Sequence, residues 1–263
     1  MPQFAAISRE RHANKAWRRY TDYHFAARET LLPLVIAELS RAAVNMPTAL
    51  ISQEDGFKLV AVTALAPGKN LFVAPSGQWL GNYVPAVLRG YPFRLIRPQN
   101  AQDPVLCIDE DSGLLTEDDD GESFFDAQGN PTELVKQIMD FLAQVEHSRV
   151  ATDLAVAAIA EAGLIEPWPM KLKKDGQEVE VTGLHRISEA KFNALDDEAF
   201  VKLRHAGALP IAILQMVSMQ QIMVFDRLLQ LQERLNQNKG SQSVDLDNVF
   251  GNDQSGTLRF DFQ

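Results

Sequence analysis

The segment from residue 54 to residue 96 constrains the fold of this chain more than any other part. It combines short strand-like runs, tight turns and aromatic residues of the kind that proteins bury. Glu54-Asp55-Gly56 separates the apolar residues 49–51 from the alternating residues 57–62, and Asp-Gly between such runs is a strong signal for a β-hairpin. The segment contains no His, no Cys and no Gly-rich phosphate loop. The segment therefore indicates a folded domain with a binding function rather than an enzyme active site.

Further strand-like runs follow at residues 71–73, 93–96 and 105–108, and a turn signal follows nearly every run. Residues 48–115 show no alternation of strands with helices, which argues against a parallel sheet. Later in the chain the apolar spacing becomes helical. The sequence predicts an α+β protein with a mostly antiparallel, β-rich N-terminal half and a helical C-terminal half.

The predicted organisation has three parts. A basic, aromatic arm comes first, a single large domain follows, and the chain closes with a polar tail that we expect to lack a fixed structure. The ranges are 1–28 for the arm, 29–236 for the domain (β-rich 48–115, helical 131–163, β-hairpin 168–185, helical 188–236) and 237–263 for the tail.

Composition excludes several functions. The net charge of −10 argues against binding to nucleic acids and to anionic membrane surfaces, which both need Lys and Arg. Cys107 is the single cysteine, so no intramolecular disulfide forms, and its apolar neighbours predict an inert buried thiol. The N-terminus has no apolar signal segment, and the apolar runs 31–39 and 209–217 are short. We therefore expect a cytoplasmic protein without membrane insertion, which reaches the cell surface only by a signal-independent route.

The arm has two interpretations. Basic residues alternate in it with Trp17, Tyr20, Tyr23, His24 and Phe25. These aromatic side chains either dock on the body or stack on a nucleic acid. The acidic remainder of the chain favours docking.

Residues 109–130 form an acidic stretch. Its carboxylates, above all Asp118, Asp119 and Asp120, would suit a weak divalent-cation site, but Gly113 breaks the spacing of an EF-hand. A solvated acidic loop is the favoured interpretation. The five histidines lack the i, i+4 spacing of a helical metal site, so we expect structural or surface histidines and no cofactor.

An aromatic cluster forms the candidate ligand pocket. Aromatic side chains near prolines often wall such pockets, although they also fill cores, and the two arginines beside this cluster could recognise a carboxylate. The candidate residues are Trp79, Tyr83, Arg89, Tyr91, Phe93 and Arg94.

The final helix is apolar around most of its circumference, so it needs neighbours on several sides. Either the domain buries it fully, or a protein partner or second copy covers part of it. Leu258, Phe260 and Phe262 alternate with polar residues in the tail, which is typical of a strand added to a sheet edge, or they belong to a frayed terminus. The predicted interface residues are Met216, Met219, Met223, Leu258, Phe260 and Phe262.

An ordered series of motifs resembles the bacterial SapC family from about residue 29 to residue 235. The resemblance implies no catalytic residues, and it implies an association with surface layers, or with halogenases and TonB-dependent receptors. The motifs are Asn70-Leu71-Phe72, Gly77, Trp79, Tyr83-Val84-Pro85, Arg89, Tyr91-Pro92-Phe93, Cys107-Ile108-Asp109, Phe124-Phe125-Asp126, Gly129-Asn130-Pro131, Leu164-Ile165-Glu166-Pro167 and 203–218.

These observations favour a non-catalytic binding or accessory protein that has a protein partner or forms a homo-oligomer. The alternative is an enzyme, or the obligate partner of one, that acts on peptides or aromatic metabolites. Two or more polar groups that converge in a pocket would distinguish the alternative.

Overall fold

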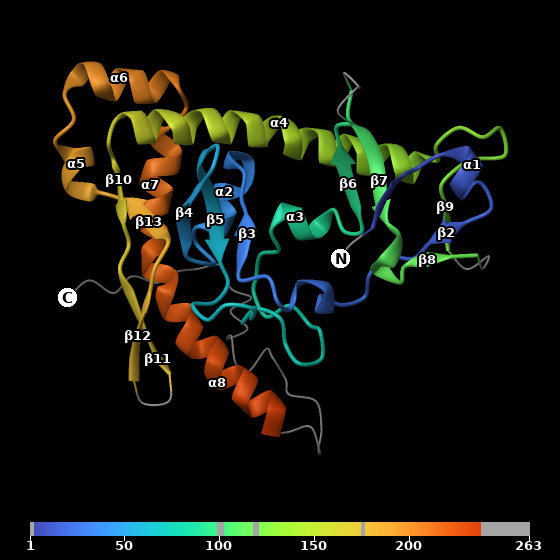
Figure 1. Cartoon of the computed structure of the whole chain (residues 1–263), viewed down its shortest axis with the longest axis horizontal. Helices are drawn as coiled ribbons and strands as arrows, with labels where there is room; N and C mark the ends of the chain where they lie inside the picture. Colours follow the sequence, from blue (N-terminus) through green and yellow to red (C-terminus); the bar gives the residue numbers. More distant parts are fainter. Residues whose placement is uncertain (1–2, 99–102, 118–120, 175–176, 238–263) are drawn as a thin grey trace, which may run out of the picture.

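The computed structural model describes residues 3–98, 103–117, 121–174 and 177–237. It confirms the α+β class, because the strands pair antiparallel and the helices lie mostly in the C-terminal half. Figure 1 shows two lobes, each built on its own strands, with the long helix α4 (Glu133–Glu161) extending across both of them.

The large lobe contains a five-stranded antiparallel sheet in the order β10-β13-β4-β5-β3. The predicted hairpin joins β4 to β5, where Gln53 pairs with Gly56; Gly56 has φ +118°, a conformation that favours glycine. Helices α2, α4 and α7 pack on this lobe, and β11 and β12 form a ribbon that projects from it (Figure 1). The bounds are β3 Leu31–Pro33, α2 Ile36–Ala42, β4 Thr48–Gln53, β5 Gly56–Val62, β10 Ile165–Pro167, β11 Met170–Lys174, β12 Gln177–Val181, β13 Leu184–Ile187, α5 Glu189–Asn193, α6 Asp197–His205 and α7 Leu209–Ser218.

The small lobe combines the N-terminal arm with the acidic stretch. Strand β1 of the arm pairs with β7, and β2 lies between β8 and β9. A separate apolar core forms here from Trp17, Phe93, Leu106, Ile108, Phe124 and Val135. The bounds are β1 Phe4–Ala6, α1 Arg9–His12, β2 Ala16–Trp17, β6 Phe93–Ile96, β7 Val105–Asp109, η2 Glu110–Ser112, β8 Leu115–Thr116 and β9 Glu122–Ser123. Between the lobes lie α3 (Ala86–Arg89) and η1 (His24–Ala26), whose Ala26 packs in the core of the large lobe.

Residues 71–73 and the acidic stretch adopt a different local structure from the one that the sequence predicted. Residues 71–73 form no strand, and only an isolated bridge joins Val73 to Trp79. The acidic stretch is not a plain loop, because a 3-10 turn and two short strands lie in it. Asp109 is buried and accepts hydrogen bonds from the backbone N–H groups of Gln3 and Asp111. The Asp109 carboxylate therefore caps the 3-10 turn that follows it and holds the backbone at Gln3.

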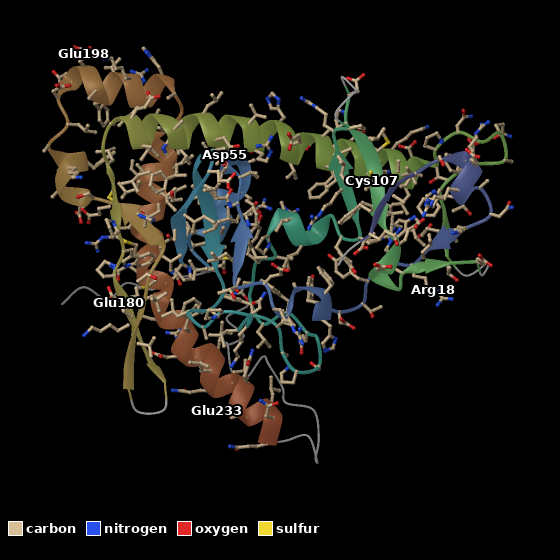
Figure 2. The ribbon with its side chains drawn as sticks, viewed as in Figure 1. Arg18, Asp55, Cys107, Glu180, Glu198 and Glu233 are labelled. Carbon is tan, nitrogen blue, oxygen red and sulfur yellow. The ribbon has the colours of Figure 1, made fainter. Side chains whose placement is uncertain are left out.

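Cys107 lies on β7, the central strand of the β1-β7-β6 sheet in the small lobe (Figure 2). It is buried and unpaired, and burial raises the pKa of its thiol. A raised pKa disfavours the nucleophilic thiolate, which agrees with a structural role.

His12 links the stability of the small lobe to pH. Its ring is fully buried against Phe124, Nδ1 accepts a hydrogen bond from the Ser8 N–H (3.3 Å), and Nε2 lies 3.4 Å from Glu110. Burial lowers the pKa of His12, and the Glu110 charge opposes this only in part. The folded ring is therefore neutral where an unfolded histidine, with a pKa near 6.5, takes up a proton.

We expect the contribution of His12 to the free energy of unfolding to reach its maximum above pH 6.5. This contribution should fall as the pH is lowered through that value. Urea unfolding of the parent and of His12→Gln at pH 7.5, 6.5 and 5.5 measures this dependence. The variant is expected to be less stable at every pH but to lose less stability on acidification. An equal loss in both proteins would contradict the assignment.

The C-terminal helices form one continuous run. The segment from residue 209 to residue 237 joins α7, the 3-10 segment η3 (Met219–Met223) and α8 (Val224–Gln237) into 29 helical residues. By length and composition alone this run could cross a membrane, and only 28% of its most apolar stretch is buried. The sequence predicted a long apolar helix over this segment, and the expectation of no membrane insertion, which rested on the short apolar run 209–217, stays a prediction.

Candidate functional site

The structure divides the six residues of the predicted pocket among the core of the large lobe and two cavities. Trp79 is buried in the core of the large lobe, where its ring stacks on Phe72 and its Nε1 donates to the Tyr83 carbonyl (2.9 Å). The Tyr83 hydroxyl donates a hydrogen bond to the Glu38 carboxylate (2.7 Å). These two residues therefore have structural roles, and the other four line cavities.

Glu38 is a buried carboxylate that joins α2 to the start of α3. It accepts hydrogen bonds from the N–H groups of Val35 (3.2 Å) and Ala86 (2.7 Å) as well as from Tyr83. Burial, the bond to Glu38 and its negative charge raise the pKa of Tyr83 to about 12. Tyr83 is thus a neutral hydrogen-bond donor at physiological pH.

Two neighbouring cavities lie where the lobes meet, and Tyr91 and Phe93 line both. The first, which we call the arginine pocket, has a volume of 370 Å³. It is lined by Trp17, Arg19, Tyr20, Arg89, Gly90, Tyr91, Phe93, Leu134, Ile138 and Phe141.

The second cavity, the acidic pocket, has a volume of 660 Å³. Asp109 and Asp111 line it together with Arg94, whose guanidinium lies 4.8 Å from the Phe4 ring centroid. Tyr91, which separates the two cavities, has its pKa raised mainly by burial and further by the Asp109 charge. Arg89 and Arg94 therefore belong to different cavities.

Aromatic residues of the N-terminal arm, which the sequence did not place at a cavity, form part of these walls. Phe25 stacks on Tyr91 with a centroid distance of 3.8 Å and an interplanar angle of 7°. Tyr20 contacts Tyr23, Phe25 and Tyr91 edge-on. The acidic remainder of the chain favoured docking of the arm on the body, but no sequence signal identified the residues on which it docks.

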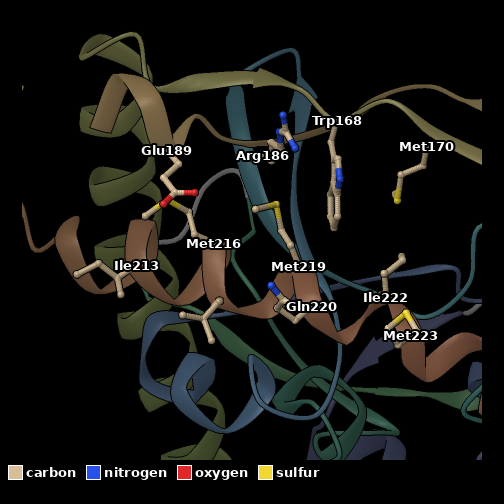
Figure 3. Close-up of a pocket in the computed structure, with 11 residues that line it drawn as sticks. Trp168, Met170, Arg186, Glu189, Ile213, Met216, Met219, Gln220, Ile222 and Met223 are labelled. Atoms are coloured by element: carbon tan, nitrogen blue, oxygen red, sulfur yellow. The ribbon is translucent and has the colours of Figure 1, made fainter. Parts of the chain in front are cut away.

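The predicted interface methionines lie together in a third site, an open groove of 720 Å³. Figure 3 shows Met216, Met219 and Met223 on the C-terminal helical run, opposite Trp168 and Met170. We call this site the methionine groove. Its lining is Trp168, Met170, Arg186, Glu189, Ile213, Met216, Val217, Met219, Gln220, Ile222 and Met223.

Helix α7 is held to the sheet by polar side chains. Gln215, fully buried, accepts a hydrogen bond from the Ile187 N–H (2.8 Å) and donates to the Thr48 carbonyl (3.0 Å). Ser218, also fully buried, accepts from the Thr48 N–H (3.1 Å). These bonds fix the helix, and with it the orientation of its outer face, relative to β4 and β13.

The outer face of α7 is apolar and exposed. Ile213 is 47% exposed and Val217 is 50% exposed, and Met223 beyond them is 64% exposed. Arg186, at the edge of the groove, pairs with Glu166 (2.9 Å). Hydrogen bonds from Ser188 and Arg186 lower the pKa of Glu166, which keeps this edge charged.

Two groups of predicted site residues lie outside the described residues. These are the acidic residues 118–120 and the tail residues 258, 260 and 262. Among the residues that the structure describes, no group of three or more His, Cys, Asp or Glu side chains is arranged to hold a metal ion.

The SapC family model matches residues 7–224 of the chain. The chain belongs to the SapC family. No curated protein and no solved structure matches the chain. The SapC match includes every residue that lines the arginine pocket and the methionine groove, and every residue that lines the acidic pocket except Phe4. These sites are thus part of the SapC region and not additions to it.

Proposed function

We propose that this SapC family protein is a non-catalytic binding or accessory protein whose methionine groove binds a protein partner. The observation that carries the proposal is the arrangement of α7. Its buried face holds Ile211 and Ala212 as well as Gln215 and Ser218, while the apolar Ile213 and Val217 face outward. A helix on the surface of a soluble monomer usually presents polar residues to solvent, and an apolar groove exposed in this way is typical of an interaction site.

The lining of the groove suits a protein segment. Four of its eleven lining residues are methionines, whose unbranched and polarisable side chains adapt to the shape of a partner. A helix forms one wall of the groove (Figure 3), so an amphipathic helix of the partner could lie along it with its apolar side chains inward.

The SapC resemblance suggests which partners to test. Surface-layer proteins come first, followed by halogenases and TonB-dependent receptors. A second copy of the chain is the alternative occupant of the groove, and a lipid bilayer is another outcome to test because of the long apolar run. The net charge of −10 disfavours an anionic bilayer.

The enzyme alternative rests on the acidic pocket. Arg94, Asp109 and Asp111 converge there, as an enzyme acting on peptides or aromatic metabolites would need. However, Asp109 already accepts two structural hydrogen bonds. We therefore favour the binding function.

Charges placed in the groove are expected to abolish binding without unfolding the protein. In Val217→Glu combined with Met223→Glu, both carboxylates remain hydrated because both positions are at least half exposed. Complex formation would bury them at a cost of several kcal/mol. Size-exclusion chromatography with light scattering, on native extract and on purified protein, measures assembly, and circular dichroism checks the fold.

The matched control is Leu154→Glu on α4. Leu154 is 67% exposed and does not line the groove, so this variant should assemble like the parent. A parent that elutes as a 29.3 kDa monomer under every condition would contradict the proposal. Loss of assembly in Leu154→Glu as well would also contradict it, and co-sedimentation with neutral vesicles would identify a bilayer as the occupant.

A further inference from the structure

The arginine pocket has the size and the walls of a small-molecule site. Its volume of 370 Å³ lies within the range of ligand cavities in proteins. Phe93 and Phe141 supply aromatic surface, and Leu134 and Ile138 of α4 supply aliphatic surface. Such walls accept a flat, apolar ring.

Arg89 gives the pocket its charge. Its guanidinium carbon lies 5.1 Å from the Phe141 ring centroid and 5.9 Å from that of Tyr83. One guanidinium nitrogen lies 3.4 Å from the Tyr83 hydroxyl. Among the described residues, no carboxylate lies within ion-pair distance of Arg89. Most of its N–H donors therefore remain available, and their fork matches a carboxylate.

Arg19 and Tyr20 add to the recognition of a negative charge. Arg19 lies 3.8 Å from Glu122, and both side chains are at least half exposed, so this contact is weak. Burial and the neighbouring Tyr23 raise the pKa of Tyr20 to about 12, which leaves its hydroxyl protonated. The pocket thus combines two cations with a neutral phenol in a chain whose net charge is −10.

Trp17 provides an independent sign of an incomplete site. Its ring lines the pocket and is 4% exposed, and its Nε1–H has no acceptor among the described residues. A buried donor without a partner is unfavourable. An acceptor oxygen that entered the pocket could satisfy it after a small movement of the ring.

We propose that the arginine pocket binds a small aromatic carboxylate, with the ring between the aromatic walls and the carboxylate on Arg89. This inference is independent of the proposed protein-binding function, because the pocket and the methionine groove share no residue.

Isothermal titration calorimetry with 1-naphthoate, and with the uncharged 1-naphthamide, tests the proposal. We expect saturable binding of 1-naphthoate and much weaker binding of the amide. Arg89→Met keeps most of the apolar stem but removes the charge, so affinity should fall by about tenfold to a hundredfold. Ile138→Trp should fill the pocket and abolish binding.

Arg94→Met is the matched control, because Arg94 is also exposed and also stacks on a ring, but lines the acidic pocket. It should bind 1-naphthoate like the parent, and so should the groove variant Val217→Glu with Met223→Glu. The proposal is overturned if 1-naphthoate shows no saturable binding, if the amide binds equally well, or if Arg94→Met loses as much affinity as Arg89→Met. Circular dichroism verifies that each variant is folded.

Discussion

Glu38→Ala is expected to destabilise the protein by about 4 kcal/mol. The substitution leaves three donors in the interior without their acceptor, namely the N–H groups of Val35 and Ala86 and the Tyr83 hydroxyl. An unsatisfied buried donor costs about 1–3 kcal/mol, and water can reach some of the site once the side chain is gone. Urea unfolding followed by circular dichroism measures the loss.

The same variant changes the titration of Tyr83. Without the Glu38 charge and hydrogen bond, its pKa should fall from about 12 toward 10, which ultraviolet difference spectroscopy detects as earlier formation of tyrosinate. Glu198→Ala is the control, because Glu198 lies on α6, exposed and well separated from α2 (Figure 2). Equal urea midpoints for Glu38→Ala and the parent would show that the carboxylate does not join the two helices.

Phe124→Ala is expected to unfold the small lobe while the large lobe remains folded. Phe124 is fully buried in a core of few residues, and truncation of a buried Phe costs about 3–5 kcal/mol. The large lobe has its own, much larger core. Hydrogen exchange should therefore become fast in β7 of the small lobe and stay slow in the β4–β5 hairpin of the large lobe.

Phe200→Ala on α6 serves as the control, because Phe200 is an exposed aromatic residue far from the small lobe. Its exchange pattern should match that of the parent. Uniformly faster exchange throughout Phe124→Ala would mean that the two lobes unfold as one cooperative unit, and the small core would then have no stability of its own.

The parts of the fold that sequence could predict depend on local chemistry. The β4–β5 hairpin forms at the turn that Asp55-Gly56 indicated, although Gln53 pairs with Gly56, so that Glu54 and Asp55 form the loop and Gly56 begins β5. Helix α4 begins where Thr132 accepts a hydrogen bond from the Val135 N–H, close to the start that Pro131 and Glu133 predict. It is helical from Glu133 to Glu161, within the predicted helical range 131–163.

The parts that sequence could not predict depend on contacts between distant segments. Gln3 meets Asp109, and Glu38 meets Tyr83, across 106 and 45 residues. Spacing within one segment carries no information about such pairs. The aromatic cluster was therefore interpreted as one pocket, whereas the fold places Trp79 in the core and divides Arg89 and Arg94 between two cavities.

The environment of the C-terminal helical run also could not be predicted from the sequence. Its apolar residues predicted neighbours on several sides, and the sequence left open whether the domain or a partner supplies them. The structure places Gln215 and Ser218 inside and leaves Val217 exposed, because these polar groups satisfy the backbone of β4 and β13. Only the fold reveals that apolar residues also occupy the outer face, while the buried face includes Ile211 and Ala212 beside these polar groups.

Photo-crosslinking at position 217 tests the central claim most directly. The parent chain carries p-benzoylphenylalanine in place of Val217 and is irradiated in its native cells, with position 154 as the matched site. We predict a crosslinked product at 217 that equals the 29.3 kDa chain plus a distinct protein, or twice the chain for a second copy. The product should disappear in Met223→Glu and be absent at position 154. Crosslinks to lipid alone, or identical products at positions 217 and 154, would contradict a protein-binding groove.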